Sequence, residues 1–386
     1  MNPSKIGTVY AAHNGIIGAL REELIDTSQE TDTQIAKLMH TPAGAFGSCR
    51  HKLTADGPEL TRIMEVFRAH DIGYFFYNGG GDSQDTAAKI AEYSQSIGFP
   101  VTCVGIPKTV DNDLPFTDAC PGFGSVAKYI AIATREASLD VASMCESSTK
   151  LFILEVMGRH AGWIAAAAGL AGQHPHEAPH IILFPEVPFD ESQFLQRVSE
   201  CTREYGYCVV VAAEGIKNMQ GKFVADAGLR DAFGHAQLGG VAPILAQLIK
   251  KELRLKYHWA VADYLQRSAR HIASAVDLEQ AYALGKKAVD LALSGTSGVM
   301  PIIVREQDSP YRWSVSHVPL AEVANQEKKM PSTFIRPDGM GITPDCRQYL
   351  LPLIQGEAYP PYHAGLPDYI QIQPNLIPQR LPKWEK

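Results

Sequence analysis

The chain has 386 residues, of which 45% are hydrophobic and 20% charged, a composition typical of a globular protein long enough for two or three domains. Its formal net charge of −7 excludes a general basic surface for nucleic acid, so any anion site must be built locally. The seven cysteines are dispersed without a CxxC pair, no signal-peptide pattern opens the chain, and the apolar run IAAAAGLAG is too short to span a bilayer. These features predict a cytoplasmic protein without a membrane span.

Short apolar runs alternate with longer amphipathic stretches along the chain. Strands are expected at residues 72–78, 100–106, 150–157, 180–186, 207–215 and 298–304, and helices at 82–98, 124–138, 161–171, 191–205, 239–254 and 277–295. This alternation predicts an α/β fold with mostly parallel sheets covered on both faces, in which ligands bind at the carboxyl ends of the strands. The proline-rich segment from about Leu350 is expected to wrap the surface.

The stretch YNGGGDSQDTA, residues 77–87, places three glycines between a strand and a helix. Glycines let backbone N–H groups approach a ligand, and a helix N-terminus attracts anions. The pattern is equally typical of a plain turn in which Asp82 or Ser83 caps the helix. An acid at position 82 repels phosphate, which is sensible if the pocket accepts a short phosphate chain and rejects a longer one.

The stretch GIPKTVDNDL, residues 105–114, brings Lys108, Asp111 and Asp113 together directly after an apolar run. A lysine can offset the charge of a phosphoryl group in transfer, one aspartate can accept a proton from a hydroxyl, and the other can help to hold a metal ion. The alternative is a solvated Asx-turn loop. The position after a strand, together with the lysine, favours a site.

Further polar residues come after other predicted strands or glycine turns. They are Arg159 in VMGRHAG, Glu214 in AAEGI, Tyr264 and Arg267 in YLQRSARH, and Arg50 and Lys52 in GSCRHKL. Taken singly, each is also compatible with a surface arginine or a capping carboxylate. The stretch PGFGS, residues 121–125, predicts a tight turn into a helix rather than a dinucleotide site, because no strand directly precedes it.

In this order, the glycine loop, GIPKTVDNDL, PGFGS, MGRHAG, EG and LQR resemble the motifs of the phosphofructokinase family, from about Ile6 to about residue 320. Asp82, where ATP-using members carry a small residue, and Lys108, where many carry glycine, resemble the pyrophosphate-dependent branch. The resemblance implies reversible phosphoryl transfer from pyrophosphate to the 1-hydroxyl of fructose 6-phosphate in glycolysis. Asp82 would exclude ATP by occupying the place of a nucleotide's α-phosphate, and Lys108 would stabilise the transferring group.

The resemblance also implies roles for the other motif residues. Asp111 would be the base that takes the proton from the 1-hydroxyl. The acceptor would be lined by Thr109, Val110, Asp111, Met157, Gly158, Arg159, Glu214, Tyr264 and Arg267, and the donor by Gly80, Gly81, Asp82 and Arg50. Asp113 is the candidate ligand for Mg²⁺, through water. Tyr264 replaces a histidine usual in ATP-using members, and Gly81 replaces an acid that often helps to hold the metal.

The implied architecture is two doubly wound, mostly parallel domains with the active site in the cleft between them. Residues 1–140 with 268–330 would form the phosphoryl-donor domain, 141–267 the sugar-phosphate domain, and 331–386 a C-terminal extension. The family suggests a homodimer. The family begins with a strand and a Gly-Gly turn, whereas the opening residues of this chain resemble the family's sequence after that unit. The first strand is therefore expected to be missing, which would leave a strand edge unpaired.

Three alternatives remain open. One is an ATP-dependent 6-phosphofructokinase, and another is a non-catalytic sugar-phosphate-binding homologue that lacks a complete donor site. The third, a nicotinamide-dependent dehydrogenase, is disfavoured because no GxGxxG comes after the first predicted strand with an acid about 20 residues further on.

Overall fold

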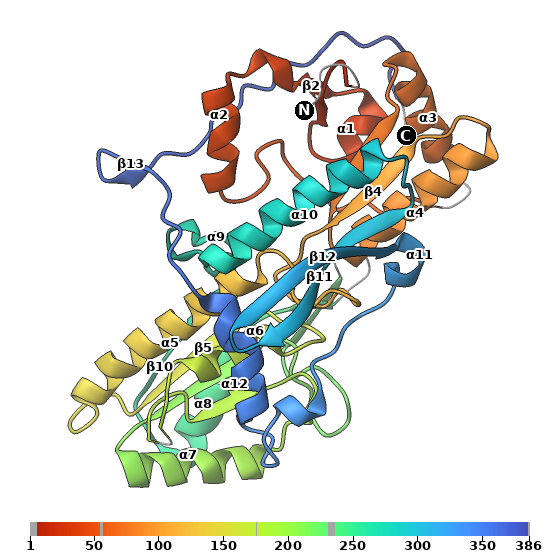
Figure 1. Cartoon of the computed structure of the whole chain (residues 1–386). Coiled ribbons are helices and arrows are strands. Elements are labelled where there is room, and N and C mark those ends of the chain that lie inside the picture. Colours follow the sequence, from red (N-terminus) through yellow and green to blue (C-terminus); the bar gives the residue numbers. More distant parts are fainter. Residues whose placement is uncertain (1–5, 55–56, 175, 231–235, 385–386) are drawn as a thin grey trace.

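The computed structural model describes residues 6–54, 57–174, 176–230 and 236–384. They contain two four-stranded sheets that lie toward opposite ends of the molecule (Figure 1). The first sheet has the strand order β12 (Tyr311–Pro319), β11 (Val299–Asp308), β4 (Thr102–Pro107) and β3 (Tyr74–Gly79). The second sheet has the order β10 (Tyr257–Val261), β5 (Leu151–Val156), β7 (Cys208–Ala213) and β6 (Ile181–Leu183).

Helices cover these sheets and connect their strands. The helices are α1 (Ile16–Arg21), α2 (Asp32–Lys37), α3 (Pro58–Ala69), α4 (Gly81–Ser96), α5 (Phe123–Met144), α6 (Trp163–Ala167), α7 (Glu191–Tyr205), α8 (Val241–Leu253), α9 (Leu265–Ser268), α10 (Ala275–Leu293), α11 (Leu320–Val323) and α12 (Pro344–Leu350). Three short antiparallel pairs complete the described part: β1 (Tyr10–Ala12) with β2 (Leu24–Asp26), β8 (Asp226–Arg230) with β9 (Ala236–Leu238), and β13 (Tyr362–His363) with β14 (Leu366–Pro367).

The first sheet is parallel from β3 through β4 to β11 and ends in the antiparallel hairpin β11–β12. Side chains of successive residues in β11 point to opposite faces of the sheet. Val299 belongs to a cluster with Ala288 and Leu291 of α10, whereas Met300 packs in a cluster that includes residues of α4 and α11. The period of two in a strand therefore lets one strand anchor helices on both sides of the sheet.

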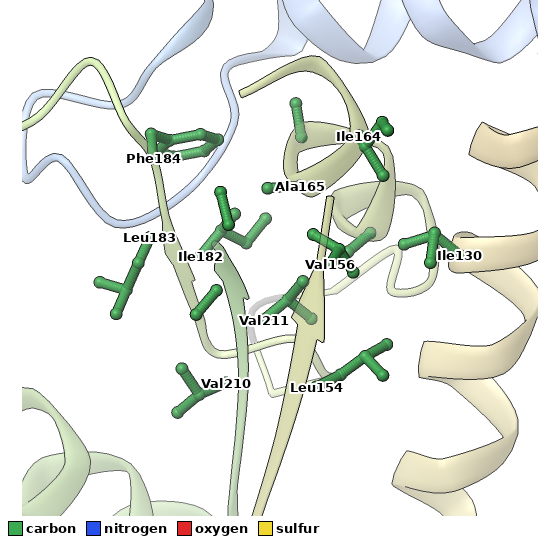
Figure 2. Close-up of a cluster of buried hydrophobic side chains, with 14 of the residues drawn as sticks. Ile130, Leu154, Val156, Ile164, Ala165, Ile182, Leu183, Phe184, Val210 and Val211 are labelled. Carbon is green, nitrogen blue, oxygen red and sulfur yellow. The ribbon is translucent and has the colours of Figure 1, made fainter. Parts of the chain in front are cut away.

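The second sheet is parallel throughout, and the largest cluster of buried apolar side chains in the described residues packs around it. Figure 2 shows Val156 of β5 beside Ile164 of α6 and Ile130 of α5, and all three side chains are at most 2% exposed. β7 is buried along its whole length, as expected for an inner strand of a parallel sheet. Each such buried aliphatic side chain contributes about 1.5–3 kcal/mol.

Each helix and strand predicted from the sequence is present, with shifted ends. The helix predicted at 124–138 continues to Met144, and the strand predicted at 298–304 is the first arm of a longer hairpin. The elements that the prediction missed include α3, β10 and β12. β10 and β12 lie at sheet edges and are partly exposed, so their sequences lack the apolar run that marks an inner strand. No helix in the described ranges is long and apolar enough to cross a membrane.

β3 is the outer strand of the first sheet within the described part of the chain. Its burial alternates, and Tyr74 and Phe76 are 36% and 37% exposed. The sequence suggested a fully buried strand here, and that expectation is wrong for these two side chains. The strand nevertheless pairs with β4 over its full length, from Tyr74 opposite Thr102 to Gly79 opposite Pro107.

The C-terminal segment runs back over the N-terminal elements, as expected for a surface wrap. Asp368 lies 2.9 Å from the Lys37 ammonium of α2, and Ile377 N donates to Leu24 O at 2.9 Å. The fully buried carboxylate of Glu22 accepts hydrogen bonds from Arg380 N at 2.6 Å and Leu381 N at 3.1 Å. The segment is therefore attached by main-chain hydrogen bonds as well as by one ion pair.

Glu22 is the group that makes this attachment sensitive to pH. Burial alone would raise the pKa of Glu22, but the N–H donors of Arg380 and Leu381 and the ring of His70, 2.6 Å away, outweigh burial and hold it below its usual value. A depressed pKa means that this carboxylate stabilises the fold above the unfolded-state pKa. The contribution is lost as the pH falls through the lower, folded-state pKa.

We expect Glu22→Gln to lower the free energy of unfolding at pH 7 by about 1–3 kcal/mol, because the neutral amide satisfies the buried donors poorly. Urea denaturation from pH 7 down to pH 3 should show a smaller loss of stability with acid in the variant than in the original protein. Glu279→Gln, on an exposed position of α10, is the matched control. Equal stability and equal acid sensitivity of Glu22→Gln and the control would contradict this role.

Candidate active site

The glycine loop and the lysine-containing loop meet where β3 and β4 end side by side. Lys108 N donates to Gly79 O at 3.0 Å, and a Cβ on Gly80 would lie 3.8 Å from Lys108 O. Helix α4 begins at Gly81 with Gly80 as its N-cap and no capping side chain. The alternative that Asp82 or Ser83 caps this helix is therefore wrong, and Asp82 is available for another role.

Asp82 is paired instead with Lys52. The Lys52 ammonium lies 3.1 Å from Asp82 Oδ1, and the two side chains are 48% and 38% exposed. Lys52 belongs to a segment without regular secondary structure before α3, which also carries the exposed Arg50. The sequence places Lys52 beside Arg50 in one basic stretch, but no local pattern links it to Asp82, 30 positions later.

The loop from Lys108 to Asp113 is anchored through the asparagine between its two aspartates. Asn112 is fully buried at a positive φ of 55°, accepts from Cys120 N at 3.0 Å and donates to the Tyr349 hydroxyl at 3.0 Å. Asp111 and Asp113 on either side of it stay partly accessible. The loop is thus a fixed structure, and the alternative of a solvated Asx turn is wrong.

Lys328 holds the same loop from a distant part of the sequence. Its ammonium donates to Thr117 O and Asp118 O, each at 2.9 Å, and its backbone N–H donates to Asp113 O at 2.6 Å. Burial lowers the pKa of Lys328, while nearby anionic groups including Asp118 and Asp113 oppose that shift. Sequence reasoning missed this residue, because only the fold brings it to the aspartates.

The pKa of Asp111 is influenced by charged groups from several of the predicted motifs. Burial raises the pKa of Asp111 to about 7, and the carboxylates of Asp113 and Glu214 contribute to the increase. The cationic groups of Lys108 and Arg159 act in the opposite direction. Residues predicted from separate motifs, and carried by both sheets, are therefore close enough to influence one acid.

The other two carboxylates experience the same environment. Burial raises the pKa of Asp113, and Glu327 adds to the increase, while the Thr109 hydroxyl lowers it. Burial likewise raises the pKa of Glu214, and Arg159 opposes the change. Because three acids share a poorly solvated region, the site favours bound positive charge.

Two glycines bring the Arg159 loop and the Glu214 loop into contact at the end of the second sheet. Gly158 has a φ of +133°, and Gly215 N donates to Gly158 O at 3.2 Å. A Cβ on Gly215 would lie only 2.0 Å from Arg159 O. Glycine at 215 is thus required for the close approach that places Arg159 beside Glu214.

Tyr264 and Arg267 lie on the same side of the site. The Arg267 guanidinium stacks on the Tyr264 ring at 4.1 Å, and Tyr264 is 58% exposed. Burial and then the neighbouring Arg267 charge lower the pKa of Lys108, while Asp111 and Asp113 raise it. The intervening Gln266 accepts from Met157 N at 3.3 Å and so ties this segment to the strand end that carries Met157.

A cavity of about 220 Å³ borders this region and is lined in part by Val110, Gly122, Gln266 and Arg267. Gly122, with a φ of 99°, is the N-cap of α5, and the Asp277 carboxylate of α10 accepts hydrogen bonds from Gly122 N and Ser125 N. The predicted tight turn into a helix at PGFGS is therefore confirmed, with its cap supplied by another helix.

Arg50 is exposed and lies two positions before Lys52, in the segment that precedes α3. Within the described ranges, no group of three or more His, Cys, Asp or Glu side chains is arranged to hold a metal ion. The carboxylate pair of Asp111 and Asp113 suits only a cation that keeps most of its own water.

We expect Asn112→Ala to lower the free energy of unfolding by about 1–3 kcal/mol, because it leaves the buried Cys120 N without its acceptor and removes the amide that donates to the Tyr349 hydroxyl. Urea denaturation monitored by circular dichroism measures this loss. Asn375→Ala, at an exposed position of the C-terminal segment, is the control and should change stability little. An Asn112→Ala protein as stable as this control would show that the loop is not anchored as described.

The chain is similar to known proteins over nearly its whole length. A family model described as Phosphofructokinase matches residues 3–292. A pyrophosphate--fructose 6-phosphate 1-phosphotransferase of Methylococcus capsulatus is 63% identical over 382 residues, covering 98% of this chain and 91% of the relative. An enzyme of the same name from Halomonas elongata is 60% identical over 384 residues, covering 99% of this chain and 92% of the relative. The crystal structure of a pyrophosphate-dependent phosphofructokinase from Marinobacter aquaeolei superposes with a TM-score of 0.92 at 61% identity, covering 100% of this chain and 92% of that chain.

Proposed function

The chain belongs to the phosphofructokinase family, and we propose that it transfers a phosphoryl group from pyrophosphate to the 1-hydroxyl of D-fructose 6-phosphate, giving fructose 1,6-bisphosphate and phosphate. The single observation that carries the mechanism is the position of Asp111. It lies among Lys108, Arg159 and two further carboxylates, and its pKa is about 7. A general base is most effective when its pKa lies near the working pH.

The reaction can be written with these side chains. The Asp111 carboxylate accepts the proton of the 1-hydroxyl, and the hydroxyl oxygen forms a bond to one phosphorus of pyrophosphate. The bond between that phosphorus and the bridging oxygen breaks, and phosphate leaves with the bridging oxygen. Lys108 and Arg159 offset the negative charge on the group in transfer, which is the main requirement of phosphoryl transfer.

The acceptor would lie at the strand ends that carry Met157, Gly158 and Glu214. Arg159 and Arg267 provide guanidinium groups that suit a sugar phosphate. Glu214 provides an acceptor for sugar hydroxyls. The exposed Tyr264 ring, stacked under Arg267, would fix that guanidinium on the acceptor side. The hydrogen bond from Lys108 N to Gly79 O joins the loop that carries Thr109 to the glycine loop, and so would keep the acceptor and the donor adjacent.

The donor would lie over the glycine loop, at the N-terminus of α4. Asp82 would prevent a longer phosphate chain from occupying this place, and this explains a preference for pyrophosphate over ATP. The relatives of about 60% identity support pyrophosphate rather than ATP as the phosphoryl donor. Arg50, two residues from Lys52, would reach the donor from the preceding segment.

Mg²⁺ fits the carboxylates that the site offers. Asp111 and Asp113 are held two residues apart on a fixed loop, and burial raises the pKa of both. Two such carboxylates are destabilised by each other and suit Mg²⁺, which typically binds one or two carboxylates, substrate phosphates and water. We assign the principal contact to Asp113, through water, and Gly81 offers no side chain. When bound, Mg²⁺ would neutralise part of the charge on pyrophosphate.

We also propose a homodimer. Large apolar side chains are exposed around the edge strand β10 of the second sheet. Trp259 is 45% exposed, Val261 38% and Leu265 64%. An exposed apolar cluster on a sheet edge is typical of a surface that associates with another chain.

Asp111→Asn should lower kcat at least about 100-fold, because it removes the base, while the Kd for fructose 6-phosphate changes little. A coupled assay with pyrophosphate, run beside calorimetry with the sugar phosphate, measures both quantities. Asp140→Asn, at an exposed position of α5, is the control. Near-normal turnover of Asp111→Asn would remove the base assignment. Binding without turnover on either donor by the unmodified protein would favour a non-catalytic homologue.

The double variant Asp82→Gly with Lys108→Gly should shift the ratio of kcat/KM for ATP to that for pyrophosphate upward by at least about tenfold. Removing the carboxylate opens space for a longer phosphate chain, and removing the lysine weakens stabilisation of the pyrophosphate-derived group. Steady-state rates with each donor at saturating fructose 6-phosphate give the ratio. An unchanged preference for pyrophosphate would place the discriminating residues elsewhere.

A further inference from the structure

A carboxylate at the mouth of a pyrophosphate site creates an electrostatic conflict. The charge of Asp82 that disfavours a nucleotide also repels pyrophosphate, which is itself highly charged. The proposed roles of Asp82 and Lys108 leave this conflict unresolved. The ion pair between Lys52 and Asp82 Oδ1, at 3.1 Å, addresses it directly.

Lys52 is held in place by anchored neighbours on both sides. His51 Nε2 lies 2.9 Å from Glu59 Oε1 of α3, and Leu53, 1% exposed, accepts at its carbonyl from Lys89 Nζ at 3.0 Å. The segment has no regular secondary structure, so these contacts fix the point from which the Lys52 side chain extends.

Helix α4 provides the matching surface. Lys89 pairs with Asp85 Oδ2 at 2.6 Å, one turn along the helix. Asp82, Asp85 and Lys89 are spaced at i, i+3 and i+7, so they lie along one face of α4. The segment around Lys52 is thus attached to this face twice, once through Lys89 and once through Asp82.

We propose that Lys52 is a positioning residue for donor specificity, an inference that rests on the proposed pyrophosphate-dependent function. Lys52 holds the Asp82 carboxylate in one orientation and cancels its charge toward the solution. Pyrophosphate then approaches a nearly neutral corner, while the fixed carboxylate still occupies the place that a longer phosphate chain needs. Because both side chains are more than one-third exposed, the pair adds little to folding, and its effect should appear in donor binding.

The test measures kcat and the KM values for pyrophosphate, ATP and fructose 6-phosphate in five variants. They are Lys52→Met, Lys52→Arg, Asp82→Asn, the double variant Lys52→Met with Asp82→Asn, and Lys286→Met, an exposed control on α10. Lys52→Met should raise the KM for pyrophosphate about tenfold by exposing an unpaired carboxylate, with kcat and the KM for fructose 6-phosphate within about twofold of the original. Lys52→Arg should restore most of the loss.

The double variant is decisive. It makes the corner neutral again, so its KM for pyrophosphate should return to within about threefold of the original value. A double variant as impaired as Lys52→Met would overturn the proposal, because Lys52 would then contact pyrophosphate itself. An unchanged KM in Lys52→Met would overturn it as well.

Calorimetric Kd values for pyrophosphate, measured without fructose 6-phosphate, separate this inference from the proposed function. The Kd values should rank the variants in the same order as the KM values. If the unmodified protein binds pyrophosphate with this pattern but does not turn it over, the proposed reaction fails and the role of Lys52 stands. If it turns over pyrophosphate but the Kd values do not respond to Lys52→Met, the reaction stands and the role of Lys52 fails.

Discussion

Burial of the Asp111, Asp113 and Glu214 carboxyl groups, with Asp111 also facing the charges of the other two, is the constraint on which the site depends. Three carboxylates in a poorly solvated region have raised pKa values, and only cations can make their joint ionisation favourable. Lys108 and Arg159 supply part of this compensation. The carboxylates are not fully compensated by these two cations. The site therefore suits a reaction in which a metal ion binds together with a phosphate donor.

The fold keeps these charges together by rigid means. Parallel strands end side by side within each sheet, so residues from distant motifs come together at the strand ends of both sheets. Asn112 and Lys328 then fix the aspartate loop from behind through buried hydrogen bonds. Gly215 allows the Arg159 loop to approach without a clash. Preorganisation of this kind holds the charges where the reaction needs them without reorganisation during the reaction.

The inner strands, and the site residues that come directly after them, could be predicted from the sequence. Buried strands such as β7 are continuous apolar runs, and the polar residues after them are conspicuous by contrast. The edge strands β10 and β12 were missed, because half-exposed strands carry mixed residues. Lys328, and the pairing of Lys52 with Asp82, were missed for a different reason. The partners of Lys52 and Lys328 lie 30 and about 215 positions away, and only tertiary structure brings such residues together.

The most direct test of the charge balance is the pKa of Asp111 in the protein without metal or substrate. Carbon NMR of protein labelled at its aspartate carboxyl groups, assigned with Asp111→Asn, would monitor this single group through a pH titration. A midpoint near pH 7 is the predicted result. A midpoint near 4, the value of a solvated aspartate, would contradict the account, because Asp111 would then feel neither the burial nor the neighbouring carboxylates.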